Sequence, residues 1–305
     1  MEHKRVMPLL IVVLAAACVV MTVILVSVSR GVHYLPEKSV DDLAAYLANE
    51  GIVIDRELIP TRRQNAPVYV CDSPEYNRTV AELLDGSAVR SVYATPDGEV
   101  LILSDGARLE FGDSFSFRYY RSGTAERVPA SFQPAGMEIS EAKRKDVSET
   151  VVDFLDRGSS EFAELHVETA VESVWENDGK YYALCSRTID GIEIAGNRVL
   201  CTVEADQVIE AYGTWCFLTP ARSYSAQLSD LLNILFNVKK ELGSRENDEE
   251  AEDGIVTVTA VKLCYSLYFY GEEASFCLIP CWQIVTDTAG ELIYNAIDST
   301  LYTVK

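Results

Sequence analysis

The chain has 305 residues, a net charge of −21 and 16 tyrosines, and 48% of its residues are hydrophobic. Such a composition is typical of a globular protein with a large core and excludes a disordered chain. Residues 1–30 carry a charge of +2, so the remainder carries −23, and this charge repels nucleic acid and anionic lipid headgroups. We therefore expect no nucleic acid among the partners.

An uninterrupted apolar segment covers residues 6–28. These 23 residues include no charge, and their number is sufficient for a helix that crosses a bilayer. A cleaved signal peptide is one alternative, although its apolar core is usually shorter. A lipoprotein signal ending at Cys18 is another, although Ala15 stands where leucine is usual and the apolar run continues beyond the cysteine. We therefore expect an uncleaved membrane anchor.

The charges around this segment indicate its orientation. Lys4 and Arg5 precede it and Arg30 follows it, so the basic excess lies on the N-terminal side. Positive charge favours the cytoplasmic side of a membrane. The sequence therefore predicts a cytoplasmic tail at residues 1–5, a single transmembrane helix at 6–29 and a body outside the cell membrane.

Small residues mark one face of the predicted anchor. Ala15, Cys18, Thr22 and Ser29 are spaced 3, 4 and 7 residues apart and share a stripe with Val26. Small side chains allow a second helix to come close within lipid. The stripe predicts a contact between membrane helices, and chance in an alanine-containing segment is the alternative explanation.

Residues 34–133 form a first predicted unit of helices and short strands. A helix is predicted at 36–50, with Ser39 as its N-cap and Gly51 as its C-cap, and a second helix is predicted at 76–84. Alternating apolar residues between turn residues indicate an antiparallel meander. The predicted strands are 51–55, 66–70, 89–94, 99–104, 107–112 and 114–120.

Residues 138–305 form a second predicted unit. Its first helix, 140–156, is capped by Ser140, and a second helix is predicted at 227–242. Because each helix has one apolar face and each group of strands needs one face covered, we predict an α+β fold with helices on one face of antiparallel sheets. The apolar face of the first helix consists of Val147, Val151, Phe154 and Leu155. The predicted strands are 167–176, 180–189, 198–205, 208–219, 256–270, 275–286 and 291–296.

The stretch from Ile279 to Ala296 reads as a hairpin whose turn lies at 287–290. We expect Trp282 to fill the space between sheet and helix, with its indole N–H donating to a carbonyl. On the return strand, Leu292, Tyr294 and Ala296 share one face. Cys281 is therefore a neighbour of this tryptophan and not a nucleophile.

Candidates for catalysis are weak. His166 is the one histidine within the body, and its surroundings suggest no partner. Cys277 and Cys281 share a face of their strand but provide only two thiols for a metal, so we interpret both as core residues. There is no glycine-rich phosphate loop and no nucleophile elbow. We expect no catalytic residue, no metal and no cofactor, and we expect that the chain is not an enzyme.

Seven cysteines follow the anchor, an odd number that does not make a disulfide framework. Several lie in strand-like runs, where cysteine serves as a small apolar residue. Cys185 and Cys201 could face each other across a hairpin, and the sequence leaves that pairing open.

Several features follow one another in an order found in a known family. A short basic start leads into one anchor, then a helix, then Gly51–Asp55 and Leu58-Ile59-Pro60, and later the extended Pro67-Val68-Tyr69. A leucine-rich helix at 228–242 precedes a strand ending in tyrosines, and Pro280–Ile284 and Tyr294-Asn295-Ala296 close the pattern. Over nearly its whole length, the chain resembles the YycI family of Gram-positive bacteria.

This resemblance implies a membrane-anchored, extracytoplasmic regulator without catalytic or ligand-binding residues. Members of the family act with a YycH-like protein on a sensor histidine kinase of the YycG (WalK) type, which controls cell-wall metabolism, through contacts thought to involve the membrane helices. The closing pattern also resembles PepSY-type modules. The alternative function is therefore a binding or inhibitor module whose body acts on an extracytoplasmic protease or wall enzyme.

Overall fold

The structure is a computed structural model that describes residues 37–60, 66–71, 76–121, 123, 139–158, 167–217, 220–229, 231, 233–238, 255–270, 275–287 and 290–302. The predicted tail and anchor lie outside these ranges, and so do Ala15, Cys18, Thr22 and Ser29 of the stripe and His166. In the part of the chain that is described, no helix is long and apolar enough to cross a membrane.

Strands contain 56% of the described residues and helices contain 25%. The helical segments are α2 (Glu37–Asn49), η1 (Arg56–Leu58), α3 (Tyr76–Asp85), η2 (Asp113–Phe115) and α4 (Glu141–Arg157), together with residues 231 and 233–238. The strands are β1 (Ile52–Ile54), β2 (Ala66–Cys71), β3 (Val89–Thr95), β4 (Gly98–Leu103), β5 (Arg108–Gly112), β6 (Ser116–Tyr120), β7 (Val167–Asn177), β8 (Lys180–Ile189), β9 (Ile192–Glu204), β10 (Gln207–Thr214), β11 (Pro220–Ala226), β12 (Val256–Tyr270), β13 (Ser275–Thr286), β14 (Gly290–Asn295) and β15 (Leu301–Tyr302).

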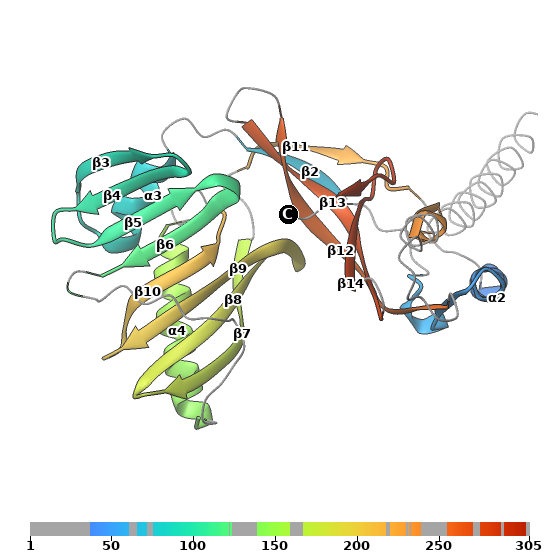
Figure 1. The fold of residues 1–305 in the computed structure, drawn as a ribbon, viewed down its shortest axis with the longest axis horizontal. Coiled ribbons are helices and arrows are strands. Elements are labelled where there is room, and N and C mark those ends of the chain that lie inside the picture. The colour runs from blue at the N-terminus through green and yellow to red at the C-terminus, as the bar shows by residue number, and fades with distance from the viewer. Residues whose placement is uncertain are drawn as a thin grey trace, which may run out of the picture.

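The predicted α+β class is wrong, because the protein is mostly β. Its strands join into one curled sheet, in which ten follow the order β11-β2-β13-β12-β9-β10-β6-β5-β4-β3 and form a half-barrel (Figure 1). The prediction assumed that each group of strands pairs with its neighbours in sequence and is then closed by a layer of helices. Strand pairing over long sequence distances closes the sheet instead, so helices contribute less of the fold than expected.

Strands from both sides of the predicted boundary between residues 133 and 138 share this sheet. β1 pairs in parallel with β12, β2 pairs with β13 and β11, and β6 pairs with β10. The boundary itself lies outside the described residues. The early segments of the chain are therefore held in place by strands that follow much later.

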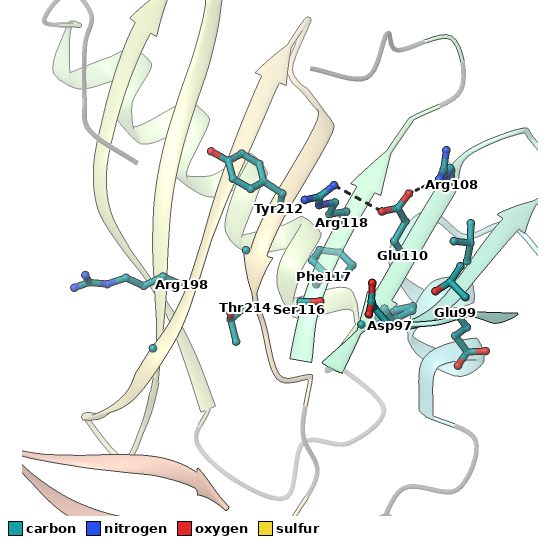
Figure 2. A pocket seen from close by; sticks show the side chains of 16 residues that line it. Asp97, Glu99, Arg108, Glu110, Ser116, Phe117, Arg118, Arg198, Tyr212 and Thr214 are labelled. Carbon is teal, nitrogen blue, oxygen red and sulfur yellow. Dashed lines mark ion pairs between the residues drawn. The ribbon is translucent and has the colours of Figure 1, made fainter. Parts of the chain in front are cut away.

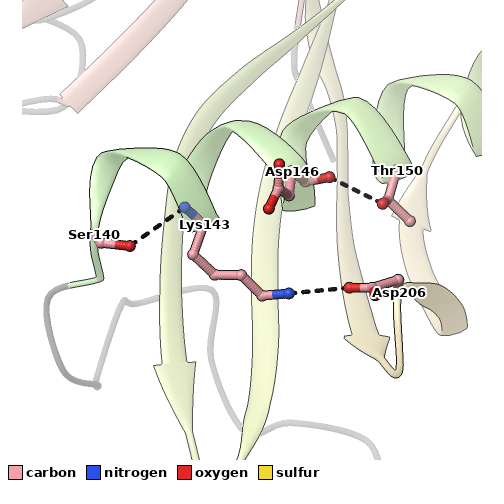
Figure 3. Close-up of polar contacts among 5 residues, drawn as sticks. All are labelled: Ser140, Lys143, Asp146, Thr150 and Asp206. Atoms are coloured by element: carbon pink, nitrogen blue, oxygen red, sulfur yellow. Dashed lines mark hydrogen bonds and ion pairs between the residues drawn. The ribbon is translucent and has the colours of Figure 1, made fainter.

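One part of the sheet, from β3 to β10, packs against α3 and α4. The cap and the apolar face predicted for α4 are confirmed. The Ser140 hydroxyl accepts from the Lys143 N–H at 3.3 Å, and the ammonium of Lys143 pairs with Asp206 at 3.0 Å, which fastens the start of the helix to the β9–β10 turn (Figure 3). The predicted apolar residues Val147, Val151, Phe154 and Leu155 are all buried.

The predicted C-terminal hairpin is also confirmed. β13 pairs with β14, and Trp282 stands opposite Tyr294. Trp282 packs in one core with α2 and the helical residues 231 and 233–238, as expected for a side chain between sheet and helix. No acceptor among the described residues lies within hydrogen-bond distance of its indole N–H, so the expected bond to a carbonyl is not found.

Helix α2 is fixed on this hairpin by its apolar face. Val40, Leu43 and Leu47 are buried in the same core as Trp282 and Tyr294. The helix begins at Glu37, so Ser39 lies inside it and is not the N-cap. At its other end, Gly51 has a φ of 83°, a left-handed conformation suited to ending a helix, and β1 follows directly.

The two parts of the sheet meet around a buried arginine. Arg187 is 1% exposed, its Nη1 donates to the Cys216 carbonyl at 2.6 Å, and its guanidinium lies 5.4 Å from the ring centre of Trp215. The side chain of Asn197 accepts from the Cys216 N–H at 3.3 Å. Trp215 belongs to the core around α4 and Cys216 to the core around Tyr265, so these bonds connect the two.

Replacing Leu47 by alanine tests whether α2 belongs to the folded core. The side chain is 0% exposed, so Leu47→Ala should lower the free energy of unfolding by about 2–5 kcal/mol. Asp42→Ala on the exposed face is the matched control and should change it by no more than about 0.5 kcal/mol. Urea unfolding followed by tryptophan fluorescence measures both. Equal midpoints for the two variants would show that α2 is not part of the core.

Candidate functional site

A hollow of about 600 Å³ lies on the sheet face that α3 and α4 leave uncovered (Figure 2). It extends across β4, β5, β6, β10 and β9, and the turn between β3 and β4 closes one end. Six of its lining residues are charged, and hydroxyl groups and glycines provide much of the rest. The charged residues are Asp97, Glu99, Arg108, Glu110, Arg118 and Arg198.

The alternation of side chains along the strands explains why charge faces this hollow. On β5, Leu109 and Phe111 are buried in the core against the helices, whereas Arg108 and Glu110 line the hollow. Successive residues of a strand point to opposite faces. Because the apolar residues face the core, the polar residues between them face the hollow. The same alternation on β6 directs Phe117 to the core and presents Arg118 to the hollow.

Glycines permit the close backbone approach at the bottom of the hollow. Gly213 on β10 has a φ of 150°, and a Cβ atom there would lie 2.2 Å from the carbonyl oxygen of Arg198. Gly98, with a φ of 148°, stands opposite Gly112, and its Cβ would lie 2.0 Å from the Phe111 carbonyl oxygen. No other residue type fits such positions without moving the neighbouring strand.

The charged residues are unevenly paired. Glu110 lies 2.5 Å from Arg108 and 4.0 Å from Arg118, so one carboxylate serves two guanidinium groups. Arg198 is paired outside the hollow with Glu172 at 3.1 Å. The Nε of Arg108 is buried and has no hydrogen-bond partner among the described residues. The Arg108–Arg118 pair therefore has more donors than Glu110 can satisfy.

The acids at the other end differ from each other. Glu99 accepts from the side-chain amide of Asn77 at 2.5 Å and points away from the other charged groups (Figure 2). Asp97 lies beside Ser116 and Phe117, and no ion pair or side-chain hydrogen bond of its carboxylate is found among the described residues. Asp97 is therefore the acid available to a ligand.

Hydroxyl groups lie between the charged ends. Ser116 on β6 stands opposite Thr214 on β10, and Arg118 stands opposite Tyr212. Burial raises the pKa of the Tyr212 hydroxyl, and the charge of Glu210 adds to the rise, while Arg118 opposes it. This hydroxyl is buried and stays protonated at neutral pH, whereas the Ser116 side chain is exposed. The hollow is therefore equipped to bind through ion pairs and hydrogen bonds.

The candidate cysteines of the sequence lie in the core of the sheet. Cys281 stands opposite Cys264 on β12, and both are buried. Burial raises the pKa of the Cys281 thiol to about 12 and that of Cys264 further. Cys277 is also buried, and no group of three or more metal-binding side chains occurs among the residues searched, which are those described. Neither thiol has the low pKa that a nucleophile needs.

The register of β8 and β9 shows whether Cys185 and Cys201 face each other. Cys185 stands opposite Val199, and Cys201 stands opposite Ala183, so the two cysteines are diagonal neighbours on β8 and β9. Both are free thiols in the core behind the hollow. Burial and a hydrogen bond with Cys185 raise the pKa of Cys201. They act as small packing residues.

The hollow was missed in the sequence. Its arginines lie on the polar face of predicted strands, a pattern that equally indicates a solvated face. The one local signal is the alternation of charge with apolar residues at Arg108, Glu110 and Arg118, together with glycines at the ends of those strands.

Comparisons with known proteins give no family. No family model matches the chain, and no curated protein matches it. It is similar to the crystal structure of an uncharacterized protein from Eubacterium rectale ATCC 33656, with 11% sequence identity and a TM-score of 0.47, over 84% of this chain and 92% of that chain. This distant likeness carries no functional argument.

Alkylation tests whether the buried thiols are unreactive in the native protein. At a pKa of about 12, Cys281 has roughly a thousandth of the thiolate of a thiol at 9.0. Iodoacetamide at pH 8, followed by peptide mass spectrometry, should leave Cys264 and Cys281 unlabelled in the native protein. The same reaction in guanidinium chloride is the control and should label both. Rapid labelling of Cys281 in the native protein would contradict this assignment.

Proposed function

We propose that the protein is a membrane-anchored, extracytoplasmic regulator that modulates a sensor histidine kinase of the YycG type, together with a YycH-like protein, and so affects cell-wall homeostasis. It acts by binding and has no chemistry of its own. The apolar run at 6–28, the stripe of small residues and the family resemblance support this proposal. The structural observation that carries it is the position of α2.

Helix α2 lies close to the predicted anchor in the chain and packs on the C-terminal hairpin in space. Seven residues, 30–36, separate the predicted end of the anchor from Glu37. Fully extended, they span at most about 25 Å. Since Leu43 and Leu47 are buried with the C-terminal hairpin, a displacement of the anchor is passed to the core and not absorbed by a long tether.

The same geometry orients the body. α2 lies at one end of the long axis of the molecule, and β4 and β5, which line the hollow, lie at the other (Figure 1). An anchor attached just before α2 therefore holds the end around β12–β14 near the bilayer and directs the hollow away from it. The regulator then has two surfaces, a helix stripe within lipid and a hollow outside it.

A binding module of the PepSY kind, acting on an extracytoplasmic protease or wall enzyme, is the second candidate. The hollow favours it, because this site belongs to the body and includes no residue near α2. The two functions differ in what the anchor does. The regulator needs the anchor for contact with its partner, whereas the binding module needs it only for location.

Co-purification from membranes tests the helix contact. Ala15→Leu combined with Thr22→Leu enlarges the stripe, and recovery of a YycG-type kinase with the full chain should fall about tenfold, which corresponds to about 1.4 kcal/mol. Val13→Leu combined with Ala17→Leu adds the same number of heavy atoms on the opposite face of the helix and should leave recovery unchanged. If both double variants recover the kinase like the natural chain, the contact does not use this stripe.

A further inference from the structure

We infer that the hollow binds an extended peptide segment in which an acidic and a basic side chain lie two residues apart, the acid at Arg118 and the base at Asp97. This inference goes beyond the proposed function, since it requires neither the anchor nor a kinase. It rests on the charges that the hollow leaves unsatisfied and on the register of the strands that carry them.

Arg118 provides the basic end. Its nearest acid, Glu110, lies 4.0 Å away and is held more closely by Arg108. Arg118 is 44% exposed, so a carboxylate can reach its guanidinium from solvent. A ligand carboxylate here would share the two arginines with Glu110 and use donors that this glutamate leaves free. Tyr212 stands opposite Arg118 on β10 and closes this side of the hollow.

Asp97 provides the acidic end. It lies in the turn between β3 and β4, and this turn is fastened to the start of η2 because the Asp113 N–H donates to the Asp97 carbonyl at 3.0 Å. Glu99 is occupied by Asn77, which leaves Asp97 as the nearest acid for an ammonium group. A free anion is disfavoured here by Asp97 and Glu110, and a free cation is disfavoured by the arginines. A ligand that carries both an acidic and a basic group matches both ends of the hollow.

The strand geometry sets the spacing of the two charges. A Cβ on Gly112 would lie 2.3 Å from the Ser116 hydroxyl oxygen and 3.1 Å from the Asp97 carbonyl oxygen, so the Ser116 side chain and the Asp97 backbone lie at one level along the strands. Asp97 precedes β4, and β5 lies between β4 and β6, so the basic group of the ligand must be on a long side chain to reach Asp97. Arg118 lies two residues beyond Ser116, which is about 7 Å along a strand. Alternate residues of an extended peptide are also about 7 Å apart. The ammonium and carboxylate groups on the α-carbon of a free amino acid such as alanine lie far closer together and cannot reach both ends.

The bottom of the hollow suits a peptide backbone. Gly112 and Gly213 have no side chain, and the hydroxyls of Ser116 and Thr214 can exchange hydrogen bonds with amide and carbonyl groups. A volume of about 600 Å³ is within the range of sites that hold short ligands. An extended segment of a partner protein, lying along β6, therefore fits the chemistry of the site.

Calorimetry with the full chain in detergent micelles tests the inference directly. The probe is a short peptide with Glu-Thr-Lys between serine and threonine residues. We expect it to bind with a dissociation constant below about 1 mM. Peptides with Glu-Lys-Thr or Glu-Thr-Glu should bind at least about tenfold more weakly. Free alanine, whose two charges lie on one carbon, should not bind, which separates a peptide from a small zwitterion.

Substitutions in the hollow complete the test. Arg118→Gln and Asp97→Asn should each weaken binding of the Glu-Thr-Lys peptide about tenfold. Arg144→Gln, on α4 and away from the hollow, is the matched control and should change nothing. Arg118→Glu should reverse the preference and favour a Lys-Thr-Lys peptide. No binding to the natural chain, or equal binding by Arg118→Gln and Arg144→Gln, overturns the inference whether or not the kinase contact holds.

Discussion

The burial of α2 against the C-terminal hairpin is the interaction on which the rest of the structure depends. Val40, Leu43 and Leu47 lie in one core with Trp282 and Tyr294, although more than 200 residues separate the two segments. Removal of this apolar area from water is the main favourable term available to a short helix. It fixes the first described helix to the β13–β14 hairpin, so the protein forms one body with a defined end beside its predicted anchor.

The opposite end is shaped by a different constraint, the curl of the sheet. Strands approach closely at Gly98 and Gly213, and the face without helices is hollowed across β4, β5, β6 and β10. Charged side chains on a flat sheet would be solvated independently. On the concave face, Arg118 and Asp97 lie around one space, and their opposite charges become a recognition pattern. The end near the predicted anchor is thus held together by apolar packing, and the opposite end presents charged side chains around a hollow.

Sequence reasoning succeeded where the signal is local. Ser140 and the four buried apolar residues of α4 follow from a cap and a helical period, and the β13–β14 hairpin follows from alternation around a turn. The fold class was predicted wrongly, because a strand of only three residues, such as β1, gives no indication that it pairs with residues 256–258. β11 was missed since Arg222 to Ser225 are all exposed and show no apolar alternation. The hollow exists only after Gly98 and Gly112 are brought opposite each other, which no local pattern specifies.

Native-state hydrogen exchange of the full chain tests most directly whether α2 and the hairpin form one unit. The account predicts that the amides of Leu47 and Tyr294 exchange through the same opening, with equal free energies and equal dependence on denaturant. Exchange of Leu47 through a local opening, several kcal/mol easier than that of Tyr294, would contradict it. In that case the anchor would be joined to the body by a loose helix, and no displacement of the membrane segment could reach the sheet.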